Sequence, residues 1–263
     1  MRRKICFLVL TTGLALLQPL DITAQSSVSF GADLMSRYIW RGVDLGGKSP
    51  AIQPQLKYSY TLANEKHTFA LGGWGSYSLA GNVNDELDLT LSYTFNKMLC
   101  LAVTDYFFPG LNMGEKDKYF VYNADSTGHV IETCVMFTGN NKIPVTAMFA
   151  MNVYGNDARK MENDSTVGGI ALSKYLEVGF VYAFKQFDLN AFIGAALDKP
   201  DKSFAPTGYY MNEKAGIINV GVKAARSFKL NDHLLMPVQS QFIFNPMLQK
   251  AYLVFGLGLS FTS

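Results

Sequence analysis

The chain has 263 residues, with 23 basic and 21 acidic side chains, and 13% of its residues are aromatic. Its length suits one domain, and this near balance of charge gives no support to nucleic-acid binding. Beyond the first twenty-four residues no stretch approaches eighteen consecutive apolar residues, so helical membrane spans are not expected.

Residues 1–24 have the pattern of a secretory signal peptide. Arg2, Arg3 and Lys4 precede an apolar stretch at 5–20, and Ile22-Thr23-Ala24 offers a cleavage site before Gln25. The alternative is a membrane anchor, for which this mixed stretch is a poor span. Removal of residues 1–24 takes away three basic residues and Asp21, which leaves 20 basic and 20 acidic side chains in the mature domain, 25–263.

The mature domain repeats one pattern of alternating apolar and polar residues, separated by turns. Leu87, Leu89 and Leu91, for example, alternate with Asp88 and Thr90. Period two predicts strands with two different faces. We expect twelve strands at 27–41, 51–62, 67–79, 86–95, 98–107, 129–138, 143–154, 174–184, 187–198, 216–227, 234–244 and 251–262.

The connections between these strands alternate between short and long. Short connections alternating with longer ones are typical of an all-β, antiparallel, up-and-down barrel of the bacterial outer membrane. A soluble β-sandwich is the alternative, but it would not be expected to sort its loops in this way. Aromatic residues near strand ends, among them Tyr38, Trp40 and Phe107, suggest an interfacial girdle. Expected partners are outer-membrane lipid and the barrel-assembly machinery, for which the strand ending near Phe261 is a near match to the assembly signal.

Several segments in the first hundred residues carry a family resemblance. The pieces are Asp33-Leu34-Met35-Ser36-Arg37-Tyr38-Ile39-Trp40-Arg41-Gly42, Ser49-Pro50-Ala51-Ile52-Gln53-Pro54, Trp74-Gly75-Ser76 and the acidic strand at 86–95. Their order resembles that of the TorF-type porins and related outer-membrane proteins of Gram-negative bacteria. The resemblance implies a location and a class of protein, and it supplies no catalytic residues.

If the apolar face of each strand meets lipid, the opposite face lines a lumen. We predict as pore-lining residues Asp33, Arg37, Arg41, Lys57, Glu86, Asp88, Glu132, Glu177 and Lys223. Two interpretations remain open. Water fills a narrow lumen that passes small solutes, or ion pairs close the interior and the barrel is structural or a surface-contact protein. The long loop at 108–128 either folds inward as a constriction or extends the strands above the membrane.

An outer-membrane lipid hydrolase is the third alternative, and it depends on His129. This histidine lies on the lipid-facing side by strand parity, where barrel phospholipases and lipid A deacylases place their catalytic histidine. Those families carry a serine two residues later, whereas this chain has Ile131. A hydrogen-bonded histidine at a strand end is therefore the favoured interpretation, and we predict that the protein is not an enzyme.

No metal or cofactor site is expected, because no Cys and His residues have the spacing of metal ligands. Cys100 and Cys134 share lumen parity on neighbouring strands and are expected side by side, as free thiols or as a disulfide. Asp105 breaks its strand's pattern by facing lipid, which a bulge or a strand end would explain.

Overall fold

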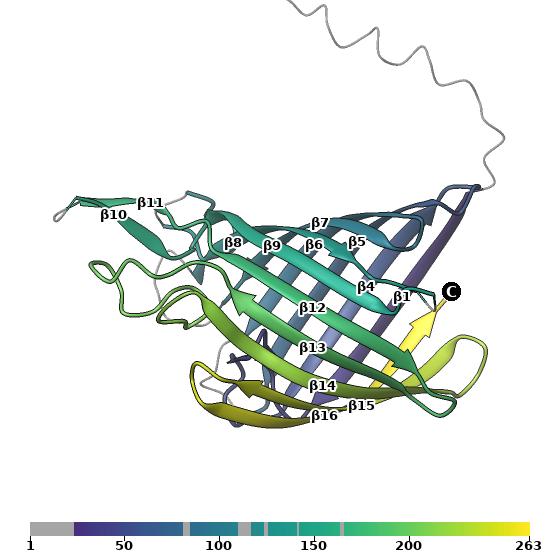
Figure 1. Ribbon diagram of the computed structural model, residues 1–263. Helices are drawn as coiled ribbons and strands as arrows, with labels where there is room; N and C mark the ends of the chain where they lie inside the picture. The colour runs from purple at the N-terminus through teal and green to yellow at the C-terminus, as the bar shows by residue number, and fades with distance from the viewer. Residues whose placement is uncertain (1–23, 81–84, 110–116, 124–125, 141, 164–165) are drawn as a thin grey trace, which may run out of the picture.

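The computed structural model describes residues 24–80, 85–109, 117–123, 126–140, 142–163 and 166–263. Twelve strands in this part of the chain close into one antiparallel barrel (Figure 1). They are β1 (Gln25–Met35), β4 (Ala51–Thr61), β5 (His67–Ser78), β6 (Glu86–Phe95), β7 (Leu99–Phe107), β8 (His129–Phe137), β9 (Val145–Gly155), β12 (Lys174–Ala183), β13 (Asp188–Ala196), β14 (Gly216–Lys229), β15 (Leu234–Asn245) and β16 (Lys250–Thr262).

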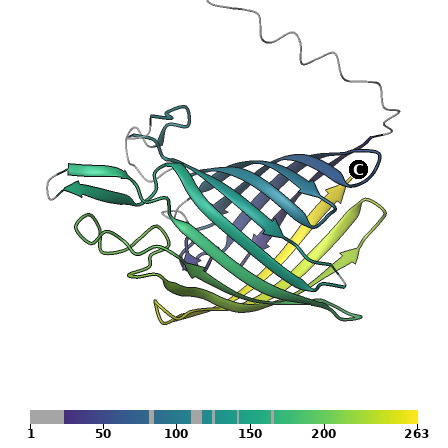
Figure 2. The same ribbon diagram turned by 45° about the horizontal axis from the view of Figure 1, so that its top comes forward.

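Each wall strand pairs with the next along the chain, and β1 pairs with β16 to close the ring. The predicted barrel of twelve strands is confirmed, and the predicted strand bounds agree with the structure to within two residues everywhere except at the end of β1. The strands are tilted against the barrel axis, as closure of a sheet requires (Figure 2).

The outer wall is apolar along its length. On alternate positions large side chains are exposed, with Leu71, Leu91 and Leu253 each more than half accessible. Every wall strand carries at least one exposed large apolar side chain on this face. Exposure of so continuous an apolar belt to water is energetically unfavourable, whereas such a belt is typical of a barrel in a bilayer. The barrel is therefore an outer-membrane barrel, and this apolar belt is its outer face.

Among the residues that the structure describes, no helix is long and apolar enough to cross a membrane.

The two ends of the barrel differ. Short turns and the C-terminus lie at one end, which is the periplasmic end of such a barrel. The longer connections lie at the other end, and one of them, between β9 and β12, contains the hairpin of β10 (Arg159–Asn163) and β11 (Thr166–Ile170). This hairpin projects beyond the rim of the wall (Figure 2).

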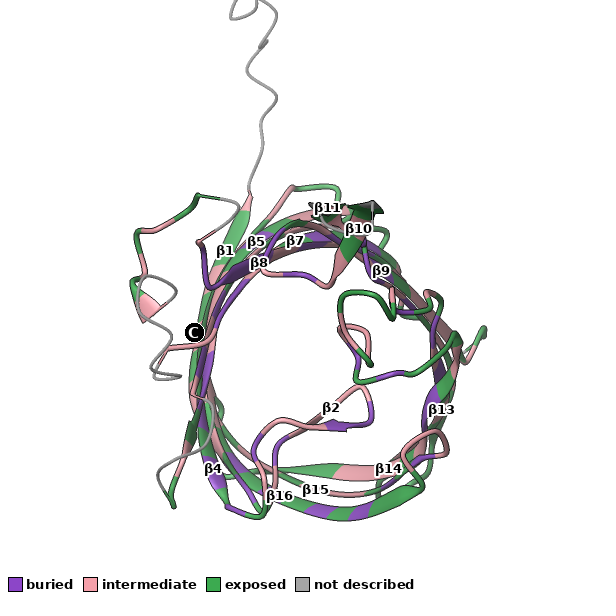
Figure 3. Ribbon diagram, turned by 90° about the vertical axis from the view of Figure 1, so that its left-hand side faces the viewer, coloured by how far each residue is buried: buried purple, intermediate pink, exposed green. Residues whose placement is uncertain are grey.

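The first wall strand is shorter than predicted. β1 ends at Met35, and residues 36–50 leave the wall and fold into the barrel, where they form the small hairpin of β2 (Ile39–Trp40) and β3 (Val43–Asp44). Figure 3, a view along the barrel from the long-loop end, shows β2 inside the ring. The prediction that Tyr38 and Trp40 belong to an interfacial girdle is therefore wrong.

Candidate functional site

The inward segment, residues 36–50, reverses direction at Arg41 and Gly42. Both residues have positive φ angles, of 50° and 80°. A Cβ on Gly42 would come within 2.0 Å of the carbonyl oxygen of Ile218 on β14, so only glycine allows this close approach. The Asn245 side chain, fully buried, donates a hydrogen bond to the Gly42 carbonyl at 3.0 Å. The tip of the hairpin is thus seated against β14 and β15.

Arg41 holds the inward segment to the wall at β8. Its Nη1 and Nη2 atoms lie 2.5 and 2.9 Å from the two carboxylate oxygens of Glu132. The Arg41 and Glu132 side chains are 8% and 2% exposed. Tyr106 donates a further hydrogen bond to Glu132, 3.1 Å long. A two-pronged, charge-assisted pair of this kind fixes both position and orientation.

Aromatic rings enclose the Arg41 guanidinium. Its central carbon lies 4.4 Å from the Trp40 ring centroid and 4.8 Å from that of Tyr175. The Tyr210 hydroxyl accepts a hydrogen bond from Nη1 at 3.2 Å, and the Tyr210 ring stacks on Trp40. Tyr210 belongs to the loop 197–215, which thereby packs against the inward segment in the outer half of the barrel. Cation–π contacts on desolvated rings add to the ion pair.

Arg37 and Arg41 were predicted to lie on the wall of the first strand, and this placement is wrong. Both belong to the inward segment. Arg37 lies 4.0 Å from Asp44 across the small hairpin and over the Tyr252 ring at 5.7 Å. The alternation of charged and apolar residues continues past Met35, but the chain has already left the wall.

The other predicted lining residues lie on wall strands at different depths. Glu86 and Asp88 are buried on β6, and one carboxylate oxygen of each has no hydrogen-bond partner among the described residues. Glu177 on β12 accepts hydrogen bonds from Tyr175, at 2.5 Å, and from Asn219, at 2.9 Å. The structure therefore brings Arg41 and Glu132 together and leaves the remaining acids in separate groups.

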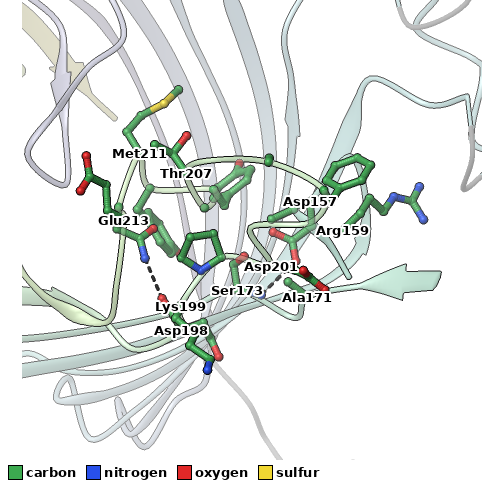
Figure 4. A pocket seen from close by; sticks show the side chains of 18 of the residues that line it. Asp157, Arg159, Ala171, Ser173, Asp198, Lys199, Asp201, Thr207, Met211 and Glu213 are labelled. Carbon is green, nitrogen blue, oxygen red and sulfur yellow. Dashed lines mark hydrogen bonds between the residues drawn. The ribbon is translucent and has the colours of Figure 1, made fainter. Parts of the chain in front are cut away.

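A cavity of about 960 Å³ opens above the inward segment at the long-loop end. We call it the outer vestibule, and its lining includes Trp40, Phe108, Asp157, Arg159, Lys199 and Tyr209. Figure 4 shows part of this lining, including Asp157 close to Ser173. The Ser173 backbone N–H and the Asn152 side chain each donate a hydrogen bond of 2.9 Å to Asp157, so the vestibule wall is internally braced.

Smaller cavities lie on the other side of the inward segment. One, of about 150 Å³, is lined by Arg37 and Tyr38 of that segment and by wall residues that include Lys223. Lys223 interacts electrostatically with Asp33 on β1. Another, of about 190 Å³, is lined by residues that include Lys57 and Trp74. The inward segment thus separates a wide outer space from narrower spaces nearer the periplasm.

The described part of the loop 108–128 does not enter the lumen. Tyr119 and Tyr122 instead pack on His129, whose strand position is outward-facing like those of the exposed Val103 and Val135. The segment that folds into the barrel is residues 36–50. Sequence reasoning missed it because its anchors, Gly42 and Asn245, act through contacts across the barrel. The first predicted strand is longer than a membrane crossing needs, and this extra length was the available sign that part of the segment leaves the wall.

His129 is completely buried beneath residues 117–123, which we call the outer strap. Its Nδ1 lies 2.7 Å from Asp105 and its Nε2 lies 2.6 Å from the Tyr119 carbonyl oxygen. Tyr122 donates a hydrogen bond of 2.9 Å to the other Asp105 oxygen. Both ring nitrogens are thus hydrogen-bonded, one to the wall strand β7 and one to the outer strap. Asp105 does face outward near a strand end, and its β7 pairings contain no bulge.

Among the described residues, no group of three or more His, Cys, Asp or Glu side chains is placed to hold a metal ion.

The barrel is similar in shape to several solved outer-membrane channels. The KdgM porin is 10% identical with a TM-score of 0.42, over 89% of this chain and 98% of that one. The CymD monoaromatic hydrocarbon channel is 10% identical with a TM-score of 0.39, over 90% and 88%. An outer membrane channel from Pseudomonas putida F1 is 10% identical with a TM-score of 0.38, over 91% and 95%.

No curated protein matches the sequence significantly. The family model described as "Bacterial protein of unknown function (Gcw_chp)" matches residues 21–242, which is most of the chain. The chain belongs to this Gcw_chp family.

Proposed function

We propose that the protein is an outer-membrane channel for small solutes and that the inward segment forms its constriction. The arrangement that carries this proposal is the series of cavities within one barrel. The outer vestibule lies on one side of the inward segment, and the cavity lined by Arg37, Tyr38 and Lys223 lies on the other. A solute that crosses between them passes the Arg41 anchor.

The balance of charge at the constriction favours weak selectivity. Arg41 is neutralised by Glu132, and Arg37 faces Asp44. The selectivity of a pore follows the unpaired charges and the width of its narrowest part. We therefore propose small conductance with little preference between anions and cations.

A plugged structural or surface-contact barrel is the second candidate. The observation that favours it is the burial of the Arg41–Glu132 pair among aromatic rings, which closes part of the cross-section. The two candidates differ in whether ions pass in the native state. In both candidates, residues 36–50 narrow the lumen of the barrel.

Single-channel recording in planar bilayers tests both candidates. We compare the wild-type chain with a variant in which residues 37–47 are replaced by a short Gly-Ser linker. For the channel we expect small wild-type conductance and a larger value in the variant. A silent wild type with a conducting variant would show a plugged barrel. Silence of both, with insertion verified by protease protection, would contradict the channel.

The β10–β11 hairpin offers a matched control for this experiment. It lies in another long connection and projects beyond the rim (Figure 2). A variant that replaces only residues 162–168 by a short Gly-Ser turn changes the same end of the barrel and keeps Arg159, which lines the outer vestibule. We expect its conductance to equal that of the wild type, because the constriction is intact.

Export and assembly complete the proposal. We propose that residues 1–24 are removed on export, which mass spectrometry of the protein from outer membranes would test. We also propose that the barrel-assembly machinery recognises the final strand, β16, in which Phe261 lies on the outer face next to Phe30. The lipid partner is the membrane that surrounds the apolar belt.

A further inference from the structure

Four sulfur-bearing side chains meet on the inner wall of the barrel. In the strand register Cys100 on β7 lies opposite Met136 on β8, and Met136 lies opposite Met148 on β9. Cys134 lies two positions from Met136 on the same face of β8. Residues directly opposite each other in antiparallel strands have Cβ atoms about 4.5–5.5 Å apart. The four side chains, the sulfur cluster, therefore occupy one patch of three adjacent strands.

The two cysteines are not directly opposite each other. Cys134 pairs with Ala102, and Cys100 pairs with Met136, so the thiols are diagonal neighbours. Both thiols are free and buried, each 8% exposed. Met136 and Met148 are half-buried and pack against the buried cluster that contains Cys134. The patch thus combines two buried thiols with two thioethers that are partly exposed.

The two acidic side chains beside this patch, Glu132 and Glu177, already have hydrogen-bond partners. Glu132, two residues before Cys134, is held by Arg41 and Tyr106. Glu177, opposite Met148, accepts hydrogen bonds from Tyr175 and Asn219. Both of these carboxylates are therefore engaged, and the four side chains of the patch offer sulfur as their donor atom. Thiolate and thioether sulfur select soft ions such as Cu(I), whereas magnesium, calcium and manganese prefer oxygen ligands.

We propose that Cys100, Cys134, Met136 and Met148 form a binding site for one Cu(I) ion. Thiols bind metal as thiolates, so occupancy releases the thiol protons to solvent. The site lies on the periplasmic side of the Arg41–Glu132 pair, because β7 begins at Leu99 and β8 ends at Phe137, next to a short turn. The ion would therefore enter from the periplasmic mouth without passing the constriction.

A competition titration tests this site on the folded, full barrel in detergent. The protein is reduced, kept without air, and titrated against the coloured Cu(I)–bicinchoninate complex. We expect one Cu(I) per barrel. Replacement of either thiol, by Cys100→Ser or Cys134→Ser, should weaken binding at least about a hundredfold, because a charged ligand is lost. Met136→Leu together with Met148→Leu should weaken it about tenfold, because these thioethers are neutral, weaker ligands.

Met211→Leu is the matched control, because Met211 is exposed on an outer loop away from the cluster. Its affinity should equal that of the wild type. Each variant is checked for folding by the heat-dependent shift of barrels on gels. A second measurement follows alkylation of the thiols by a maleimide, from which bound Cu(I) should protect both Cys100 and Cys134.

Three results would overturn the proposal. The first is the absence of stoichiometric Cu(I) binding to the folded wild type. The second is unchanged affinity in the doubly thioether-free variant, since two thiols alone would then explain the binding. The third is a Cys100–Cys134 disulfide in protein taken directly from outer membranes, detected by mass spectrometry of non-reduced peptides. None of these results bears on whether the barrel conducts ions.

Discussion

Arg41 and Glu132 are separated by 91 residues in the sequence, yet their side chains form a two-pronged ion pair in the interior of the barrel. The pair joins a segment that has left the wall to the wall strand β8. It therefore fixes the inward segment, residues 36–50, to the wall at β8.

Arg41→Ala should loosen the constriction and destabilise the barrel. The loss of Arg41 leaves Glu132 buried without its partner, which costs about 3–5 kcal/mol in comparable buried pairs. We expect a lower urea midpoint for unfolding from lipid vesicles and about twofold or greater single-channel conductance. The double variant Arg41→Met/Glu132→Met should recover most of the stability, because no unpaired charge remains. An Arg41→Ala barrel with wild-type conductance would contradict the anchoring role.

Gly42→Ala should displace the tip of the inward segment. The added Cβ would meet the Ile218 carbonyl oxygen at 2.0 Å, and the φ of 80° is unfavourable for alanine. We expect raised conductance from a barrel that still folds, as the tip is only one contact of the segment. Gly169→Ala is the control, because a Cβ there has no heavy atom within 4 Å. Equal conductance of the two variants would show that the tip does not limit passage.

Asp88→Asn and Glu132→Gln should change stability in opposite directions. Asp88 is buried with an oxygen that has no partner among the described residues, whereas both oxygens of Glu132 are engaged. Asp88 lies beside the buried Glu86 and interacts with it, so replacement of its carboxyl by an amide relieves the crowding of two buried acids and should raise the free energy of unfolding by about 1 kcal/mol. Neutralising Glu132 should lower it by more than that amount. Urea titrations of the two variants in vesicles give the comparison, and a destabilised Asp88→Asn would point to a partner that this carboxylate needs.

Leu91→Arg and Ser92→Arg test which face of the wall meets lipid. The two residues are neighbours on β6, and Leu91 is 61% exposed on the apolar belt. An arginine at mid-membrane on the lipid face costs about 2–4 kcal/mol. We expect that loss for Leu91→Arg, measured as folding free energy in vesicles, and a much smaller change for Ser92→Arg, whose side chain enters the lumen. The reverse order would mean that the faces are assigned the wrong way round.

The strands were predictable because their signal is local and repeated. Leucines such as Leu87, Leu89 and Leu91 mark one face over a whole crossing, and turn residues mark its ends. The end of β1 was not predictable in this way. Arg37 and Arg41 continue past Met35 the alternation that includes Asp33, so the alternation by itself gives no sign that the chain leaves the wall there.

The candidate site was only partly predictable for a related reason. Parity placed Glu132 on the inner face, but it could not name Arg41 as its partner, because that depends on how the inward segment crosses the lumen. Asn245 anchors Gly42 over 203 residues, and such a contact has no local signature. The alternating pattern therefore predicts which face of the wall each residue occupies. The contacts between inner residues depend on the three-dimensional fold.

The outer strap supplies the last prediction, which concerns His129. The ring is buried, joins Asp105 to the Tyr119 carbonyl, and stacks on Tyr122 at 4.1 Å. Burial and the hydrogen bond to Asp105 raise the pKa of Tyr122, so its hydroxyl remains a donor. His129→Ala should therefore release the strap, seen as faster proteolysis and amide exchange at 117–123, with unchanged conductance. Neither form should hydrolyse phospholipid or lipid A, since both histidine nitrogens are engaged. Lipid hydrolysis by the wild type that His129→Ala abolished would instead establish an enzyme.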